Sequence, residues 1–217
     1  PFSALANFGH WQIISTSPER LFAVQGERVV TRPIAGTHRR DPDPLADAQL
    51  RTQLLASGKE RAEHVMLVDL ERNDLGRICQ PGSVRVDDLM GVHTYAFVHH
   101  IESIVSGQLA PQYRQPSALL RALFPGGTIT GCPKVRTMQI IAELETAPRL
   151  AYTGSLGYLN YNGEGDFNIL IRSFLAHQGK LIFRAGAGIV ADSQATRELA
   201  ETRIKAKGLL RALGYDT

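Results

Sequence analysis

The stretch GSLGYLNYNGEGDFNILIRSFLAHQGKLIFRA, residues 154–185, carries the clearest fold signal in the chain. Extended apolar runs at 154–160 and 167–176 flank the sequence Asn162-Gly163-Glu164-Gly165, and a third run, 180–185, follows Gln178-Gly179. Glycine reaches positive φ at little cost, so both glycine-containing segments suit tight turns. The stretch therefore predicts a meander of antiparallel strands.

The same signal occurs near the start of the chain. Runs at 20–24 and 28–32 are joined by Gln25-Gly26-Glu27, and 11–15 and 94–105 also have strand composition. Helical stretches are expected at 44–55 with 59–75, at 133–145 and at 194–213. Runs of strands separated by runs of helices indicate the α+β class.

The ends of the predicted helices also have matching residues. Pro133 suits a first helical position, Asp192-Ser193 suits the N-cap of the last helix, and Gly214 can close that helix in the left-handed conformation. No linker, repeat or low-complexity tract interrupts the sequence, so we expect a single domain over 1–217. The abrupt start at Pro1-Phe2-Ser3 suggests that N-terminal sequence is missing.

The composition is that of an ordinary soluble globular protein. The 217 residues include 24 Lys+Arg and 21 Asp+Glu, so the formal net charge is 24 − 21 = +3. No basic run suggests nucleic-acid binding, and neither a membrane span nor a signal peptide is recognisable. Cys79 and Cys132 lack a CxxC partner and are expected to be reduced thiols of a cytoplasmic protein.

Two ExxE elements could carry chemistry. Glu60 and Glu63 lie on one predicted helix, and Glu198 and Glu201 lie on another. The i, i+3 spacing puts both carboxylates of each pair on one helix face. If the four met, their repulsion would call for a hard cation, and oxygen-only ligands select Mg²⁺. Solvated helix faces are the alternative explanation.

Other segments are ambiguous when taken alone. The glycine-rich segments 126–131 and 186–188 are either anion-binding loops or tight turns. Arg172 is expected on a strand, where it would face a substrate carboxylate or an internal salt-bridge partner. Lys205, four residues after Glu201, could simply form an i, i+4 ion pair with it.

Taken together, these segments resemble the family of chorismate-utilising enzymes, which includes anthranilate synthase component I, aminodeoxychorismate synthase component I and the isochorismate and salicylate synthases. The matching motifs occur in the same order along nearly the whole chain: Ser17-Pro18-Glu19, 32–37, Ala62-Glu63-His64, 67–70, Arg72-Asn73-Asp74, 131–134, Ile171-Arg172, 186–188 and 198–205. The resemblance covers the C-terminal half, or somewhat more, of a family catalytic domain.

The resemblance implies two antiparallel sheets packed as a sandwich with helices outside and the active site between the sheets. Glu63 and Glu201 would bind Mg²⁺, supported by Glu60 and Glu198, and the metal would hold the ring carboxylate of chorismate. The enolpyruvyl carboxylate would be held by Tyr152, Arg172 and the backbone N–H groups of Gly186, Ala187 and Gly188. Lys205 would lie beside the substrate.

The resemblance also implies a general acid, because a ring hydroxyl leaves poorly unless protonated. Glu19 matches that position, and it needs a raised pKa to serve at neutral pH. His100 matches a histidine that assists later stages. Gly36 and Thr37 match residues that line the ring.

Two features disagree on the subtype. The sequences at 124–127, 154–158, 166–168 and 189–193 look like those of aminodeoxychorismate synthases. Many of those enzymes, however, have a lysine nucleophile at the position of Ala35, and alanine is typical of anthranilate synthases. We favour 4-amino-4-deoxychorismate formation for 4-aminobenzoate and folate synthesis, with anthranilate formation for tryptophan synthesis as the alternative.

Either amination needs ammonia from a separate glutamine amidotransferase subunit, because no glutaminase motif occurs in this sequence. Hydrolytic isochorismate or salicylate synthesis fits the sequence less well. A further alternative is a non-catalytic fragment that binds only metal or a partner.

Overall fold

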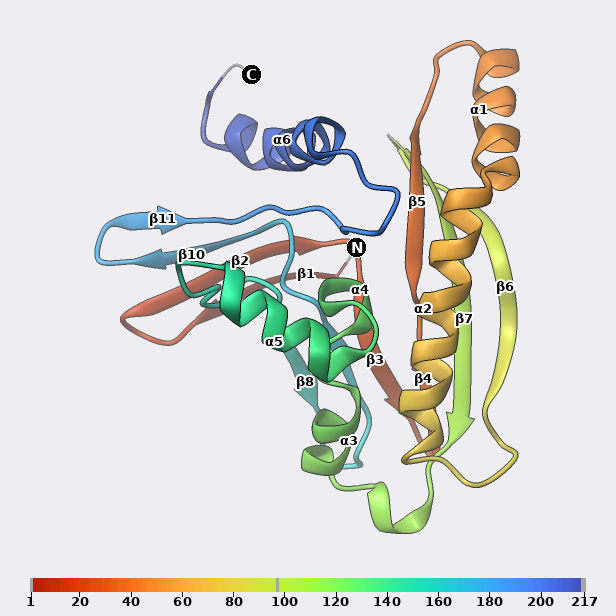
Figure 1. Cartoon of the computed structure of the whole chain (residues 1–217). Coiled ribbons are helices and arrows are strands. Elements are labelled where there is room, and N and C mark those ends of the chain that lie inside the picture. Colours follow the sequence, from red (N-terminus) through yellow and green to blue (C-terminus); the bar gives the residue numbers. More distant parts are fainter. Residues whose placement is uncertain (1, 97, 216–217) are drawn as a thin grey trace.

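Two antiparallel sheets form the frame of the protein in the computed structural model, which describes residues 2–96 and 98–215 (Figure 1). The strands are β1 Phe2–Asn7, β2 Trp11–Ser17, β3 Arg20–Gln25, β4 Arg28–Thr31, β5 Ile34–Arg39, β6 Arg85–Thr94, β7 Val98–Gln108, β8 Gly157–Leu159, β9 Gly165–Asn168, β10 Ser173–His177 and β11 Lys180–Ile182. The small sheet has the order β1-β2-β10-β11, and the large sheet has the order β5-β7-β4-β3-β9-β8. The expected α+β fold with two antiparallel sheets and flanking helices is confirmed.

The long strand β7 organises the large sheet. Its first half pairs with β5 and its second half with β4, while β6 pairs along its other edge. Alternation along β7 puts Ile101 and Val105 into the core, and both are fully buried. Sequence analysis predicted β7 but missed β6.

The helices surround these sheets. They are α1 Pro44–Ala56, α2 Gly58–Gly76, the 3₁₀ turn η1 Pro111–Tyr113, α3 Pro116–Leu123, α4 Gly127–Thr130, α5 Lys134–Leu144 and α6 Ala195–Ala212. Figure 1 shows α1 and α2 running along the face of the large sheet, and α6 lying over the β10–β11 side of the small sheet. No helix among the described residues is long and apolar enough to cross a membrane.

The predicted strand 167–176 is wrong as a single element. It ends at Asn168 in the large sheet and resumes at Ser173 in the small sheet, so the predicted meander is divided between two sheets. At the break, the N–H of Ile169 donates to the carbonyl oxygen of Glu19, and that of Leu170 donates to Gly154. Arg172 therefore lies in the crossing between the sheets, at a φ of 51°, and not on a strand.

Two predicted helix starts are also wrong. Gln194, and not Asp192 or Ser193, occupies the N-cap of α6, and its side chain makes no capping bond. The hydroxyl of Ser193 accepts from the N–H of Val190, on the side away from the helix. Pro133 is the N-cap residue of α5 and not its first helical residue. The expected end of α6 is confirmed, since Gly214 has a φ of 82°.

The main core lies between the large sheet and helices α2 and α3. Its largest fully buried members include Phe22, Leu75, Ile78, Val105 and Leu119. The glycine-rich segment 126–131 enters this core as α4. A Cβ on Gly127 would lie only 2.2 Å from Leu70 Cδ2, so glycine lets the α4 backbone rest directly on α2.

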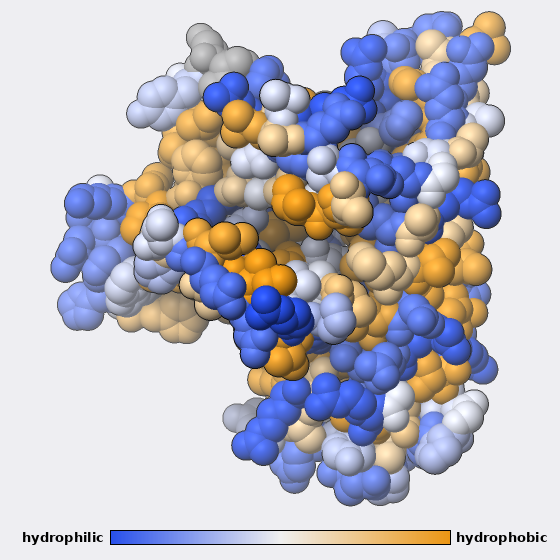
Figure 2. Space-filling model, in the orientation of Figure 1, coloured by the Kyte–Doolittle hydropathy of each residue, from blue (hydrophilic) through white to orange (hydrophobic). Residues whose placement is uncertain are grey.

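The small sheet is less covered. Leu5 and Phe8 at the β1 end are 75% and 63% exposed. On β2, the ring of Trp11 stacks on His177 of the paired strand β10, with centroids 3.5 Å apart and planes within 1°. Helix α5 also exposes apolar side chains, Val135 and Leu144 among them, and Figure 2 shows apolar residues gathered over this part of the surface.

Candidate functional site

A β-bulge on β5 builds the first part of the candidate site. Ala35 pairs with Ile101 and Thr37 with His100, so Gly36 is the extra residue between two paired positions. Gly36 has a φ of 79°, and a Cβ there would lie 3.1 Å from Glu60 Oε2. Both constraints favour glycine, which places the β5 backbone against the Glu60 carboxylate.

The bulge turns the Thr37 side chain toward His100 on the neighbouring strand. Thr37 Oγ1 lies 2.8 Å from His100 Nδ1, and the carbonyl oxygen of Gly36 lies 3.3 Å from the same nitrogen. Burial lowers the pKa of His100, which favours the neutral imidazole. A neutral ring can accept or donate a proton beside the Thr37 hydroxyl.

The two ExxE elements lie on the helices expected to carry them, α2 and α6. Burial raises the pKa of Glu63, and the negative charges of Glu60 and Glu201 raise it further. Carboxylates from both helices therefore act on one another. This charge pattern and the oxygen-only donors suit a hard dication.

Lysines neutralise part of that negative charge. Lys205 Nζ lies 2.6 Å from Glu201 Oε1, and Lys59 Nζ lies 3.9 Å from Glu198 Oε1. Within residues 2–96 and 98–215, no three His, Cys, Asp or Glu side chains are grouped closely enough to hold a metal ion. The i, i+4 ion pair expected between Lys205 and Glu201 is present. The charge of Lys205 also acts on Glu19 and Glu63.

The segment 186–188 runs from Tyr152, a candidate for binding the substrate carboxylate, to Glu63. A Cβ on Gly186 would lie 3.1 Å from the Tyr152 hydroxyl oxygen, and one on Gly188 would lie 3.5 Å from Glu63 Oε1. Ala187 is the residue between them. The backbone of this segment therefore passes close to both ends of the site.

Arg172 joins the strand crossing to α6. Its Nη1 donates to the carbonyl oxygen of Lys205 at 3.2 Å, and burial lowers its pKa while the charges of Tyr152 and Glu201 oppose that effect. The guanidinium also lowers the pKa of His100 through its charge. A half-buried cation without a carboxylate ion pair among the described residues suits an anionic ligand.

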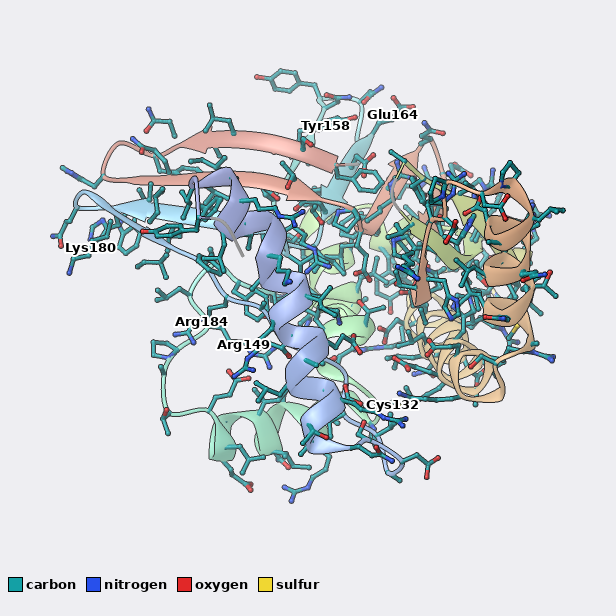
Figure 3. All side chains as sticks on the ribbon, turned by 90° about the horizontal axis from the view of Figure 1, so that it is seen from above. Cys132, Arg149, Tyr158, Glu164, Lys180 and Arg184 are labelled. Carbon is teal, nitrogen blue, oxygen red and sulfur yellow. The ribbon has the colours of Figure 1, made fainter. Side chains whose placement is uncertain are left out.

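Sequence analysis missed the other arginines near Tyr152. Arg149 lies 5.9 Å from the Tyr152 ring centroid, and Arg184 and Arg149 line one small cavity with that ring. Figure 3 shows the two arginines close to each other. Their charges lower the pKa of Tyr152, although burial dominates and raises it.

Glu19, the candidate acid, lies in the turn between β2 and β3 and is 7% exposed. Burial raises the pKa of its carboxyl to about 7, while the Thr128 hydroxyl and the charge of Lys205 act in the opposite direction. The carboxyl can therefore hold a proton close to neutral pH.

The structure thus brings most of the candidate residues into one connected region. Lys205 pairs with Glu201, and its charge lowers the pKa of Glu19 and Glu63. The charge of Arg172 lowers the pKa of Tyr152 and His100, and Gly36 lies against Glu60. Ala35 is buried beside this region, and the carboxylate of Glu198 lies at its edge near Lys59. Residues from the large sheet, from the loops that connect the two sheets and from α2 and α6 contribute.

Comparison with known proteins identifies the family. The sequence pattern described as "chorismate binding enzyme" matches residues 1–211. The chain belongs to the chorismate-binding enzyme family. The expected resemblance is confirmed.

Two relatives show how this chain compares with longer members of the family. It is 49% identical over 213 residues to an anthranilate synthase component I-like protein of Synechocystis, covering 98% of this chain and 44% of the relative. It is 48% identical to aminodeoxychorismate synthase component 1 of Bacillus subtilis, again over 98% of this chain and 45% of the relative. The chain therefore spans less than half the length of these relatives.

A solved structure agrees with the fold. Anthranilate synthase component I from Streptococcus pneumoniae superposes with a TM-score of 0.87 at 43% identity, over 95% of this chain and 45% of that one. The two-sheet architecture is therefore shared with that enzyme.

Proposed function

We propose that this chain is part of a Mg²⁺-dependent enzyme that aminates chorismate to 4-amino-4-deoxychorismate. The observation that carries the proposal is the connected region in which Glu19, the α2 and α6 glutamates, Arg172 and Tyr152 meet. It offers a buried acid, an anionic cluster and a cationic cluster to one substrate with two carboxylates.

Glu63 and Glu201 would hold the Mg²⁺, with Glu60 and Glu198 supporting them. When bound, the ion supplies positive charge for the ring carboxylate of chorismate. The mutual repulsion of Glu60, Glu63 and Glu201 supports this assignment, because a dication would relieve it. To hold the ion, these side chains would have to draw closer together than they lie in residues 2–96 and 98–215 of the structure.

Arg172 and Tyr152 would bind the enolpyruvyl carboxylate at the opposite end, together with the backbone N–H groups of Gly186, Ala187 and Gly188. Arg172 can offer two parallel N–H donors to a carboxylate. Its fixed position at the strand crossing favours one orientation of the substrate.

Glu19 would protonate the departing ring hydroxyl, and Lys205 would lie beside the substrate. The C–O bond breaks as Glu19 donates its proton, so the hydroxyl leaves as water. Ammonia forms the new C–N bond, and the resulting ammonium group can release a proton. His100, held by Thr37, would assist the later proton transfers.

The ammonia source in this proposal is a separate glutamine amidotransferase subunit. Relatives of both kinds, the anthranilate synthases and the aminodeoxychorismate synthases, are named component 1 of their enzymes. That name supports the existence of a second subunit. Co-purification of an amidotransferase, and glutamine-dependent turnover only in its presence, would test this part of the proposal.

Anthranilate formation is the second candidate function. Ala35 favours it, because its buried methyl group cannot provide an amine nucleophile. Relatives with both names have nearly the same identity to this chain, 49% and 48%. The product therefore has to be measured.

The deciding experiment incubates the protein that carries this chain with chorismate, ammonium and Mg²⁺, with EDTA as the control. A non-fluorescent amino product that yields 4-aminobenzoate only after addition of a lyase supports the leading proposal. Direct appearance of fluorescent anthranilate supports the second candidate. Metal-dependent chorismate binding without any product would instead support the non-catalytic alternative.

The same assay on Ala35→Lys tests whether this position sets the product. A lysine-bearing enzyme that still makes the wild-type product would exclude Ala35 as the determinant.

A further inference from the structure

Glu71 is a charged residue on the core-facing side of α2. The buried residues of this helix include Leu67, Leu70, Asp74 and Leu75, and Glu71 falls within their stripe. Its Oε2 atom is buried and has no hydrogen-bond partner among the described residues. A buried carboxylate oxygen without a donor is costly unless the group stays protonated or meets another polar group.

The polar groups that act on Glu71 and Glu19 come from β4, from α4 and from the turn between β2 and β3. Thr31 at the end of β4 lies beside Glu71, and Thr128 on α4 lies beside Glu19. The Oγ1 atoms of Thr31 and Thr128 are also buried and make no hydrogen bond of ordinary geometry within the described chain. We call Glu19, Glu71, Thr31 and Thr128 the buried carboxyl cluster.

The charged groups around the cluster are few. The negative charges of Glu19 and Asp74 raise the pKa of Glu71, and the positive charge of Lys134 lowers it. Lys134 Nζ lies 2.6 Å from Asp74 Oδ2, so these two largely neutralise each other. Lys205 is the charged group that acts on Glu19.

Helix α4 is what closes the cluster. Gly127 lets its backbone rest on Leu70, the neighbour of Glu71, and Gly126 lies against Leu21 and Ile169 next to the Glu19 turn. Thr128 follows directly in sequence. The glycine-rich segment 126–131 thus brings a hydroxyl to a buried carboxyl, which accounts for this segment without a bound anion.

The two carboxyls keep their protons over different pH ranges. Burial raises the pKa of Glu19 to about 7 and that of Glu71 to about 8, and the negative charge of Glu19 contributes to the latter value. Two coupled carboxyls in one apolar region lose their protons in sequence. Between these two steps the pair of carboxyls holds one proton.

Their exposure differs as well. Glu19 is buried, whereas Glu71 as a whole residue is only half-buried although its Oε2 is enclosed. In a relay, proton exchange with solvent would take place on the partly exposed side of Glu71, away from the enclosed Oε2 atom.

We propose that Glu71 is a relay residue that returns a proton from solvent to Glu19 after each turnover, acting through the hydroxyls or a water molecule of the buried carboxyl cluster. The proposal rests on the proposed role of Glu19 as the acid. Glu19 gives its proton to the leaving hydroxyl, the Glu71 O–H bond then breaks as its proton moves to Glu19, and solvent reprotonates Glu71. The ammonium group formed on the product releases a proton to solvent, so protons balance.

The test compares Glu71→Gln, Glu71→Asp and Glu71→Leu in the protein that carries this chain, with Asp69→Asn as the matched control. Asp69 lies on the same helix, and its side chain is 72% exposed. We expect Glu71→Gln and Glu71→Leu to lower kcat at least about tenfold at unchanged KM for chorismate, with a larger solvent deuterium isotope effect. Glu71→Asp should keep a higher kcat than Glu71→Gln. Added small carboxylic acids should restore part of the kcat of Glu71→Leu.

The relay is contradicted if folded Glu71→Gln keeps kcat within about twofold of wild type, or if Glu71→Gln and Glu71→Asp lose the same activity. Glu19→Gln separates this result from failure of the proposed function. Loss of activity in Glu19→Gln with full activity in Glu71→Gln excludes only the relay. Full activity in Glu19→Gln excludes the acid itself.

Discussion

Glu19 depends on burial for its proposed chemistry, and burial fixes the direction of its pH dependence. Its raised pKa of about 7 means that the protonated, donating form is present below that pH and is lost above it. We expect kcat to fall as pH rises through about 7. A profile of kcat from pH 5 to 9 measures this directly.

The substitution Glu19→Gln removes the proton but keeps the size of the side chain. We expect kcat to fall by about 10²–10⁴ and the descending limb of the pH profile to disappear. Glu143→Gln, whose side chain is 63% exposed, is the control and should keep wild-type kinetics. A Glu19→Gln enzyme that retains the wild-type profile would exclude Glu19 as the acid.

Individual site residues were partly predictable from sequence. The i, i+3 spacing was enough to predict that Glu60 and Glu63 lie on the same face of one helix, because helix geometry alone decides which residues share a face. The contact of Gly36 with Glu60, in contrast, depends on a bulge between two strands that are distant in sequence. Glu71 was missed, although a charged residue on an apolar helix stripe was a usable signal.

Elements were predicted best where glycine or proline marks their ends. The hairpin of β3 and β4 and the helices α1, α2, α5 and α6 follow from local sequence. The break between β9 and β10 does not, because Ile169, Leu170 and Ile171 are locally good strand residues. There, the N–H groups of Ile169 and Leu170 donate to the carbonyl oxygens of Glu19 and Gly154, which belong to other parts of the chain. These bonds end β9, and local sequence does not reveal them.

The contact between α4 and α2 makes a prediction at the scale of elements. Gly127→Ala would press a methyl group against Leu70, so we expect a loss of about 1–3 kcal/mol in the free energy of unfolding. Gly208→Ala is the control, since Gly208 lies within α6 with open space around it. That change should stabilise by up to about 1 kcal/mol, as measured by urea denaturation. Equal effects of the two substitutions would contradict close α4–α2 packing.

On the scale of the whole molecule, the proposed metal would join distant parts of the chain. Glu63 belongs to α2 against the large sheet, and Glu201 belongs to α6 over the small sheet (Figure 1). A ligand that binds only the folded state stabilises it by mass action. Mg²⁺ at about 100-fold above its Kd should therefore raise Tm by roughly 5–10 °C.

Glu201→Gln and Glu63→Gln should abolish this rise in Tm, whereas Glu143→Gln should keep it. Thermal melts with Mg²⁺ and with EDTA provide the measurement. The same Mg²⁺ response in the two site variants would place any bound ion elsewhere.

The stacked pair on the small sheet offers an optical view of this architecture. Trp11 is the only tryptophan in the sequence, and its ring lies on His177, so its fluorescence reports on the contact between β2 and β10. These strands come from opposite ends of the chain. Emission from Trp11 will therefore follow the small sheet, while circular dichroism reports on all the helices, of which α1 and α2 lie beside the large sheet and α6 lies over the small one. If the two signals change at different urea concentrations, the β2–β10 pair unfolds separately from the bulk of the helices.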